Sequence, residues 1–157
     1  MHRENGTLVD LNPATNRAIG KMKATITQRF TLKGVPVDVE CDSQFIFFAK
    51  KEPTSTSGGM PVWKTQYVKL FYEKDRLIPV DGKTTPDISK EELSKYDEGY
   101  QWLSVAQASL GHKIMKGLPT LNNQGFKDLN AAMVAWLEGG NVSDLLGVPK
   151  DYESMFT

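Results

Sequence analysis

The 157-residue chain has the length of one domain and is long enough to bury a substantial core. Its 19 lysines and arginines balance 19 aspartates and glutamates, so its formal net charge is zero. This balance argues against nucleic acid as a partner, because phosphate binding requires a basic excess or a basic stripe. The single cysteine excludes an internal disulfide and a cysteine-built metal site.

The opening residues, 1–6, are polar and are not followed by the apolar run of a secretory signal. No stretch of the sequence approaches the length of a membrane span. We therefore expect a soluble cytoplasmic protein with no membrane partner.

A short strand is predicted over 7–11, and a segment rich in turn-forming residues follows it at 12–16. Two long segments with alternating apolar and polar residues come next, and they meet at Lys33-Gly34. Alternation with a period of two predicts half-buried strands. Glycine at the junction suits a tight turn, because it adopts positive φ without steric cost. The pattern therefore predicts a long β-hairpin.

A two-residue loop at Lys33-Gly34 sets the register of this hairpin. Apolar residues then pair on one face, where Ile26 lies opposite Cys41. On the other face acids meet basic or hydroxyl side chains, in the pairs Arg29 with Asp38, Thr27 with Glu40 and Thr25 with Asp42. A slip of one residue would turn every side chain of one strand to the wrong face. The acids have the spacing of a metal or acid–base cluster, but their partners favour an exposed ladder.

Residues 62–74 carry apolar side chains in both alternating sets, which predicts a strand that is central or covered on both faces. A turn is expected at Asp75-Arg76. From Ser89 the pattern becomes helical, because Ser89 and Glu92 form a capping box. Gly99 interrupts this helix, and the pattern then continues to residue 111.

A second helix is expected from about Gln124 to the glycine pair at 139–140. The order of elements, with strands first and helices last, predicts an α+β fold with a curved antiparallel sheet. We expect one domain over residues 1–157, with the sheet over 6–80 and the helices over 87–146.

The sequence contains no phosphate loop, no GxGxxG, no HExxH and no GxSxG. His2 and His112 are the natural acid–base candidates. His112 follows the end of the first predicted helix, where a capping role is favoured over catalysis. His2 lies almost at the terminus, a position typical of disordered residues.

Two polar residues, Gln28 and Ser43, lie on the apolar face of the predicted hairpin. Their neighbours on that face are Met22, Ile26, Val39 and Phe45. Buried polar groups need partners, so these side chains either bond within the structure or point into a cavity. Both alternatives stay open from the residues alone, and the hydroxyl of Tyr67 is expected at the edge of the same layer.

Three runs resemble fungal SnoaL-like proteins of the nuclear transport factor 2-like superfamily: GKMKATITQRFTLKGVPVDVECDSQFIFFAKK, VWKTQYVKLFYEKDRLIPVDGKT and YDEGYQWLSVAQASLGHKI. The resemblance covers about residues 6–137. It implies a cone, in which a strongly curved antiparallel sheet wraps around helices and encloses an apolar cavity. Members usually begin with helices that close the cone, whereas this chain starts almost at its first strand.

Some members of that superfamily are polyketide cyclases, dehydratases or isomerases, and others only bind ligands or partners. The first hypothesis is therefore a domain that binds a small hydrophobic molecule without a cofactor or metal. Its ligand-binding residues would be Met22, Ile26, Gln28, Val39, Ser43 and Phe45. In a lyase or isomerase, His2 would be the acid–base group and Tyr67 a hydrogen-bond donor.

The second hypothesis is a non-catalytic module, either a homodimer or a partner-binding domain. It rests on the strand over 62–72, which is apolar on both faces and has no leading helices to cover it. An exposed apolar sheet face of this kind is expected to pair with another surface. The two hypotheses are compatible with each other.

Overall fold

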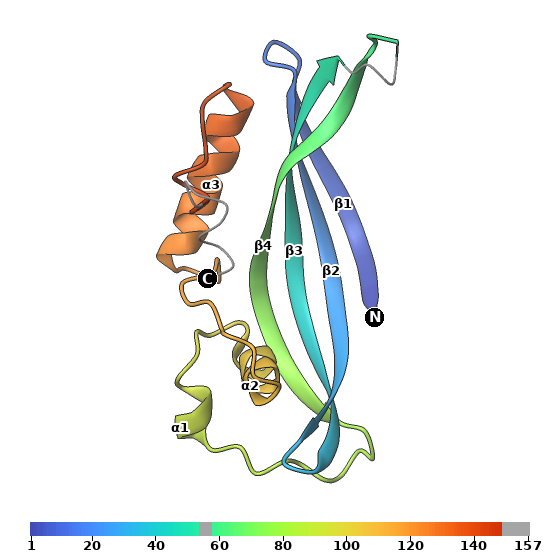
Figure 1. The fold of residues 1–157 in the computed structure, drawn as a ribbon, viewed down its shortest axis with the longest axis vertical. Helices are drawn as coiled ribbons and strands as arrows, with labels where there is room; N and C mark the ends of the chain where they lie inside the picture. The colour runs from blue at the N-terminus through green and yellow to red at the C-terminus, as the bar shows by residue number, and fades with distance from the viewer. Residues whose placement is uncertain (54–57, 149–157) are drawn as a thin grey trace.

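The computed structural model describes residues 1–53 and 58–148. Within them a four-stranded antiparallel sheet, in which sequential strands are neighbours, precedes three helices (Figure 1). The strands are β1 (His2–Asn12), β2 (Arg17–Leu32), β3 (Val35–Pro53) and β4 (Pro61–Pro79). The helices are α1 (Lys90–Leu93), α2 (Gln101–Ser109) and α3 (Gln124–Leu137). The predicted α+β class with a curved antiparallel sheet is confirmed, and the sheet stays open at both edges.

The hairpin of β2 and β3 has the predicted register, with Ile26 opposite Cys41. Both loop residues adopt positive φ, 48° at Lys33 and 82° at Gly34. A two-residue loop with positive φ at both positions matches the twist of its flanking strands, which favours this short connection. The alternation in the sequence therefore predicted the strand pairing correctly.

The acids of β3 have the partners that the register predicted at Asp38 and at Asp42, which accepts a 2.7 Å hydrogen bond from Thr25. Glu40 instead bonds to β4, and the hydroxyl of Thr27 has no hydrogen-bond partner among the described residues. Arg29 donates two hydrogen bonds of 2.8 Å to the carboxylate of Asp38, and these bonds lower the pKa of Asp38. Arg76 of β4 donates to Glu40 at 2.7 Å. Among the described residues, no group of three or more His, Cys, Asp or Glu side chains is arranged to hold a metal ion.

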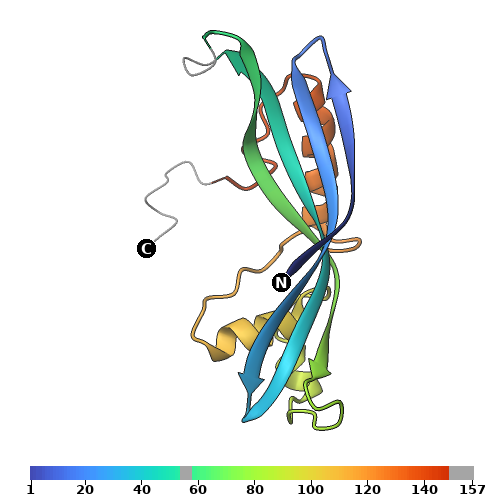
Figure 2. The same cartoon turned by 90° about the vertical axis from the view of Figure 1, so that its right-hand side faces the viewer.

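Alternation along β2 and β3 distinguishes the two faces of the sheet. The Ile26 face carries the even-numbered residues of β2 and the odd-numbered residues of β3, and the Phe48 face carries the others. The strands cross one another near the middle of their length in Figure 2, which shows a strong twist. Because of this twist, α2 packs on the Ile26 face in one half of the sheet. In the other half α3 packs on the Phe48 face.

Strand β4 differs from the prediction in its position and length. It is an edge strand, whereas its two apolar sets predicted a central or doubly covered strand. One set, which includes Phe71, packs against α3, while Val68 of the other set is exposed on the Ile26 face. The predicted turn at Asp75-Arg76 is wrong, because a register shift opposite Asp42 and Ser43 absorbs a residue and the strand continues. The sheet also begins earlier than expected, since β1 starts at residue 2.

Helices α1 and α3 begin where the sequence signals predicted. The hydroxyl of Ser89 accepts a 3.0 Å hydrogen bond from the backbone of Glu92, and α3 starts at residue 124. The first predicted helix is divided into α1 and α2, because Gly99 adopts a φ of 102° and packs closely against the backbone of β4. No helix in the described part of the chain has the length and apolar character needed to cross a membrane.

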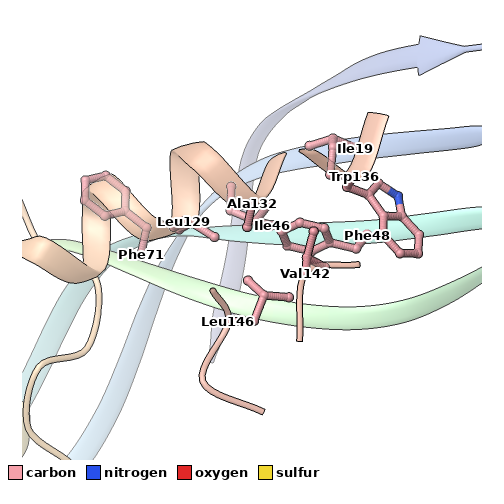
Figure 3. Close-up of a cluster of buried hydrophobic side chains, with 9 residues drawn as sticks. All are labelled: Ile19, Ile46, Phe48, Phe71, Leu129, Ala132, Trp136, Val142 and Leu146. Atoms are coloured by element: carbon pink, nitrogen blue, oxygen red, sulfur yellow. The ribbon is translucent and has the colours of Figure 1, made fainter. Parts of the chain in front are cut away.

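The larger core cluster lies between α3 and the Phe48 face (Figure 3). Its residues are Ile19, Ile46, Phe48, Phe71, Leu129, Ala132, Trp136, Val142 and Leu146. The ring of Trp136 meets Phe48 edge-on at 6.0 Å, and its Nε1 shares a hydrogen bond between the carbonyl groups of Ala18 and Ala49. The guanidinium of Arg17 lies 4.0 Å from the centre of the same ring. These contacts fix α3 to the sheet.

The smaller cluster lies under α2 and consists of Phe30, Leu32, Val37, Val39 and Ala106. Helix α2 starts at a residue, Tyr100, that provides no side-chain cap. Instead, Asp75 of β4 accepts a 2.8 Å hydrogen bond from the backbone of Leu103 in the first turn. A carboxylate at this end of a helix satisfies an unpaired N–H group and favours the helix dipole.

Replacing Asp75 by asparagine is expected to raise the free energy of unfolding at pH 7. Burial raises the pKa of Asp75, although backbone hydrogen bonds oppose this shift. A carboxyl group whose pKa is raised in the folded state stabilises the protein fully below its unfolded pKa of about 3.9. This stabilisation is lost as the pH rises through the folded pKa. Asparagine keeps an oxygen acceptor for Leu103 and carries no charge.

Urea unfolding of both proteins at neutral and acidic pH measures this effect. The advantage of the Asp75→Asn protein should shrink in acid, where the natural carboxyl is also neutral. A wild-type protein that is more stable at pH 7 would contradict the prediction, and would show that the charge at the α2 terminus outweighs the cost of burial.

Candidate functional site

The half of the Ile26 face that lies away from α2 is an open apolar surface. Figure 2 shows α3 behind the sheet in this half, so none of the described helices covers the face toward the viewer. Residues of all four strands form it, and we call them the open patch: Val9, Leu11, Met22, Phe45, Phe47, Trp63, Val68 and Leu70. The exposed fraction is 65% for Val9, 48% for Val68 and 45% for Trp63.

The open patch contains no charged side chain. On the same face Glu4 bounds it toward one end of the sheet, and Lys51, paired with Trp63, bounds it toward the other. Single exposed apolar residues are common on soluble proteins and need no explanation. A contiguous apolar surface without charge is instead typical of an interaction site or a ligand-binding groove.

Two aromatic rings form the middle of the open patch. Phe45 and Phe47 lie on one strand with ring centres 6.3 Å apart and planes only 16° from parallel. Gly20 is opposite Phe47, and a Cβ at Gly20 would lie 3.6 Å from that side chain. The ring of Phe47 therefore covers the glycine, so the surface is held in place by the sheet itself.

The residues predicted to bind a ligand share one face but have different surroundings. Met22 and Phe45 belong to the open patch and are partly exposed. Ile26 and Val39 are buried by the packing of the chain itself. The apolar stripe of the hairpin is therefore divided into a half covered by α2 and a half that is open.

The two polar residues predicted on this face also differ from each other. Gln28 accepts a 3.1 Å hydrogen bond from Nε2 of Gln107 in α2, so it bonds within the structure. The hydroxyl of Ser43 is buried, at 2% exposure of the residue, and has no hydrogen-bond partner among the described residues. Such a group is uncommon in folded proteins and carries a cost in free energy.

The structure does not bring His2 and Tyr67 together. His2 lies opposite Ile26 on the edge strand β1, exposed, with its ring 6.3 Å from that of Phe45. Tyr67 lies opposite Phe48 on the other face of the sheet, and its hydroxyl is 3.3 Å from that of Ser143. A mechanism that needs both side chains at one substrate has no support from this geometry.

Cys41 is a core residue, as predicted, and is 1% exposed. Burial, with a smaller contribution from the nearby charges of Asp75 and Asp42, raises the pKa of its thiol to about 12. Because the thiolate is the reactive form, this thiol is a poor nucleophile at neutral pH.

The sequence contains a pattern that indicates the open patch, but this pattern extends beyond the β2–β3 hairpin to β1 and β4. Val9 and Leu11 of β1, with Trp63 and Val68 of β4, add apolar surface on either side of Met22 and Phe45. In each of the four strands, the alternate residues that form the patch carry no charge. This pattern could be recognised only once the order of the strands was known.

No protein-family model matches the chain. It is 36% identical over 150 residues to an uncharacterized protein of Emericella nidulans, and the match covers 90% of this chain and 62% of that protein. It is 35% identical over 150 residues to Pea pathogenicity protein 2 of Fusarium vanettenii, with 90% of this chain and 61% of that protein covered. The chain has fungal homologues. An uncharacterized protein of Aspergillus terreus is 39% identical over 135 residues, which are 80% of this chain and 49% of that protein.

The chain thus spans about three fifths or less of the length of the curated relatives that it matches. About two fifths or more of each relative lies outside the matched region. The names of these relatives state no biochemical activity.

Proposed function

We propose that the domain is a non-catalytic binding module that pairs with a second copy of the chain through the open patch. The observation that carries this proposal is the contiguous, charge-free apolar surface on which Val9, Trp63 and Val68 are exposed. Burying apolar surface contributes roughly 25 cal/mol per Å², so removal of this patch from water favours association. No step of the proposal requires a catalytic group.

A second copy is the occupant that the charges favour. The chain has 19 basic and 19 acidic residues, so two copies do not repel each other through net charge. In an isologous dimer, the same surface of each copy contacts its equivalent on the other copy. Because the open patch has no charged side chain, this contact brings no like charges together. Glu4 and Lys51 lie near opposite ends of the patch and can meet across a two-fold axis.

The proposal includes membership of the SnoaL-like proteins of the nuclear transport factor 2-like superfamily. The long, strongly curved antiparallel sheet and the fungal homologues support this assignment. Members of the superfamily usually begin with helices that close the cone. Pairing of two copies would cover the sheet face that is open here.

The second candidate is a domain that binds a small hydrophobic molecule on the Ile26 face, with or without cofactor-independent cyclase, dehydratase or isomerase activity. The unpartnered hydroxyl of Ser43, buried on that face, is the observation that favours it. Turnover of a candidate substrate that persists when His2 and Tyr67 are replaced separately would exclude the mechanism that uses these two residues.

Replacing Val68 by glutamate is expected to weaken self-association at least tenfold in dissociation constant, about 1.4 kcal/mol. Pairing would bury the new carboxylate in apolar surroundings without a partner. Sedimentation velocity over a range of micromolar concentrations measures the association. The matched control is Val134→Glu, because Val134 has a similar exposure of 59% but lies on α3.

The wild-type and Val134→Glu proteins should sediment as dimers, and the Val68→Glu protein should sediment as a monomer with unchanged circular dichroism. A wild-type protein that remains monomeric throughout would refute pairing of two copies. Equal association of all three proteins would also refute it, by assigning the contact to another surface.

A further inference from the structure

A second apolar site, separate from the open patch, lies where α2 meets β4. It is a pocket of about 230 Å³ between α2, the segment 112–118 and the strand. Tyr72, Tyr100 and Leu103 contribute buried or half-buried walls, and Gln107 lies beside them on α2. The exposed side chains of His112 and Lys113 also line it.

Hydrogen bonds hold the wall of this pocket in place. The Oδ2 atom of Asp97 lies 2.6 Å from the hydroxyl of Tyr100 and accepts a 2.7 Å hydrogen bond from the backbone of Gly117. The backbone of Tyr72 donates a 2.8 Å hydrogen bond to the carbonyl of Pro119. The segment is therefore tied to the start of α2 and to β4. A preformed pocket reduces the entropy that ligand binding must overcome.

The shape and lining of the pocket suit one aromatic ring. The rings of Tyr72 and Tyr100 lie with their centres 5.0 Å apart at an angle of 43°, so the buried Tyr100 supports the half-buried ring of Tyr72, which is the aromatic surface of the pocket. Aromatic pairs favour tilted or offset arrangements at this range of distances. An apolar cavity of about 150 Å³ accommodates benzene, so the larger pocket has room for a ring and a small substituent.

The charges at the pocket favour an anionic substituent. In the described part of the chain, the side chains of His112 and Lys113 take part in no ion pair or hydrogen bond. Asp97 does not line the pocket, and its hydrogen bond with Tyr100 lowers the pKa of Asp97. A carboxylate on the ligand would therefore meet cationic or donor groups at the rim, while its ring contacts Tyr72.

We propose that this pocket binds a small aromatic carboxylate, with the ring against Tyr72 and Leu103 and the carboxylate at Lys113 and His112. Gln107 positions the α2 side of the site, because its amide is held by Gln28. Gln28, a polar residue predicted on the apolar face of the hairpin, thus contributes to the site through its hydrogen bond with Gln107 in α2. The proposal does not rest on self-association, because the pocket shares no residue with the open patch.

Titration of the full chain with benzoate, followed by ¹⁵N–¹H NMR, tests the proposal. Saturable shifts are expected at the amides of residues 103–107 and 112–118, with a dissociation constant in the millimolar range. Benzyl alcohol has the same ring without the charge and should bind more weakly. Shifts confined to the strands of the open patch, or no saturable shift, would overturn the proposal.

The Lys113→Gln protein separates the role of the charge from that of the ring. Its affinity for benzoate should fall about two- to fivefold, as expected for an exposed ion pair, while its affinity for benzyl alcohol stays unchanged. The matched control is Lys116→Gln, since Lys116 belongs to the same segment but does not line the pocket. Equal effects of both substitutions, or equal binding of both probes, would overturn the assignment of a carboxylate.

Discussion

Replacing Trp136 by alanine is expected to lower the free energy of unfolding by about 3–5 kcal/mol. The side chain is 5% exposed and meets the rings of Phe48 and Tyr67 edge-on at 6.0 and 5.9 Å. Its truncation leaves a cavity at the centre of the contact between α3 and the sheet. It also removes the indole N–H that bonds to carbonyl groups of β2 and β3, and the ring beneath Arg17.

Urea unfolding measures this loss, and Trp63→Ala is the matched control. Trp63 is a tryptophan of the same chain, but it is 45% exposed in the open patch. It belongs to neither core cluster, so stability measured under dissociating conditions should change by less than about 1 kcal/mol. Comparable losses for the two proteins would contradict the assignment of Trp136 to the core and Trp63 to an interaction surface.

Replacing Gly125 by alanine is expected to destabilise the protein by about 1–3 kcal/mol. Alanine in a helix is ordinarily better than glycine by about 1 kcal/mol, so the predicted sign is opposite to that of helix propensity. The reason is a close approach, because a Cβ at this position would lie 2.7 Å from the carbonyl oxygen of Gly117 and 3.1 Å from the nitrogen of Pro119. These are backbone atoms, so relief requires a shift of α3 or of the segment beside it.

Gly20→Ala is the control for this substitution. A Cβ at Gly20 would lie 3.6 Å from Phe47, which is an ordinary contact, and the residue lies within a strand. Glycine in a strand interior costs about 0.5–1 kcal/mol relative to alanine, so this substitution should be neutral or stabilising. Thermal unfolding of both proteins measures the contrast. A stabilised Gly125→Ala protein would show that α3 does not pack against the segment before it.

The sequence alone predicted the parts of the fold that depend on neighbouring residues. The turn at Lys33-Gly34 and the alternation on either side of it determine the strand pairing, because a slip would exchange the two faces of a strand. Ser89 and Glu92 mark the start of α1 in the same local way, through one side-chain hydrogen bond. The partners of Asp38 and Asp42 followed directly from that register.

The candidate sites depended on contacts that no local pattern records. Residues 45–48 are apolar in both alternating sets, so the sequence could not indicate which set each helix would cover. In the structure Phe48 packs against α3, while Phe45 lies in the open patch on the other face. Likewise the pocket joins Tyr72 of β4 with Tyr100, and the two residues meet only because α2 folds back onto the sheet.

By itself, the sequence determined the α+β class, the β2–β3 register and the starting points of α1 and α3. These features follow from turns, caps and a period of two, all of which act over a few residues. Only the tertiary structure decided which apolar surface is core and which is open. The physical reason is the twist of the long sheet. It directs opposite faces toward α2 and α3, and so leaves the charge-free half of the Ile26 face uncovered.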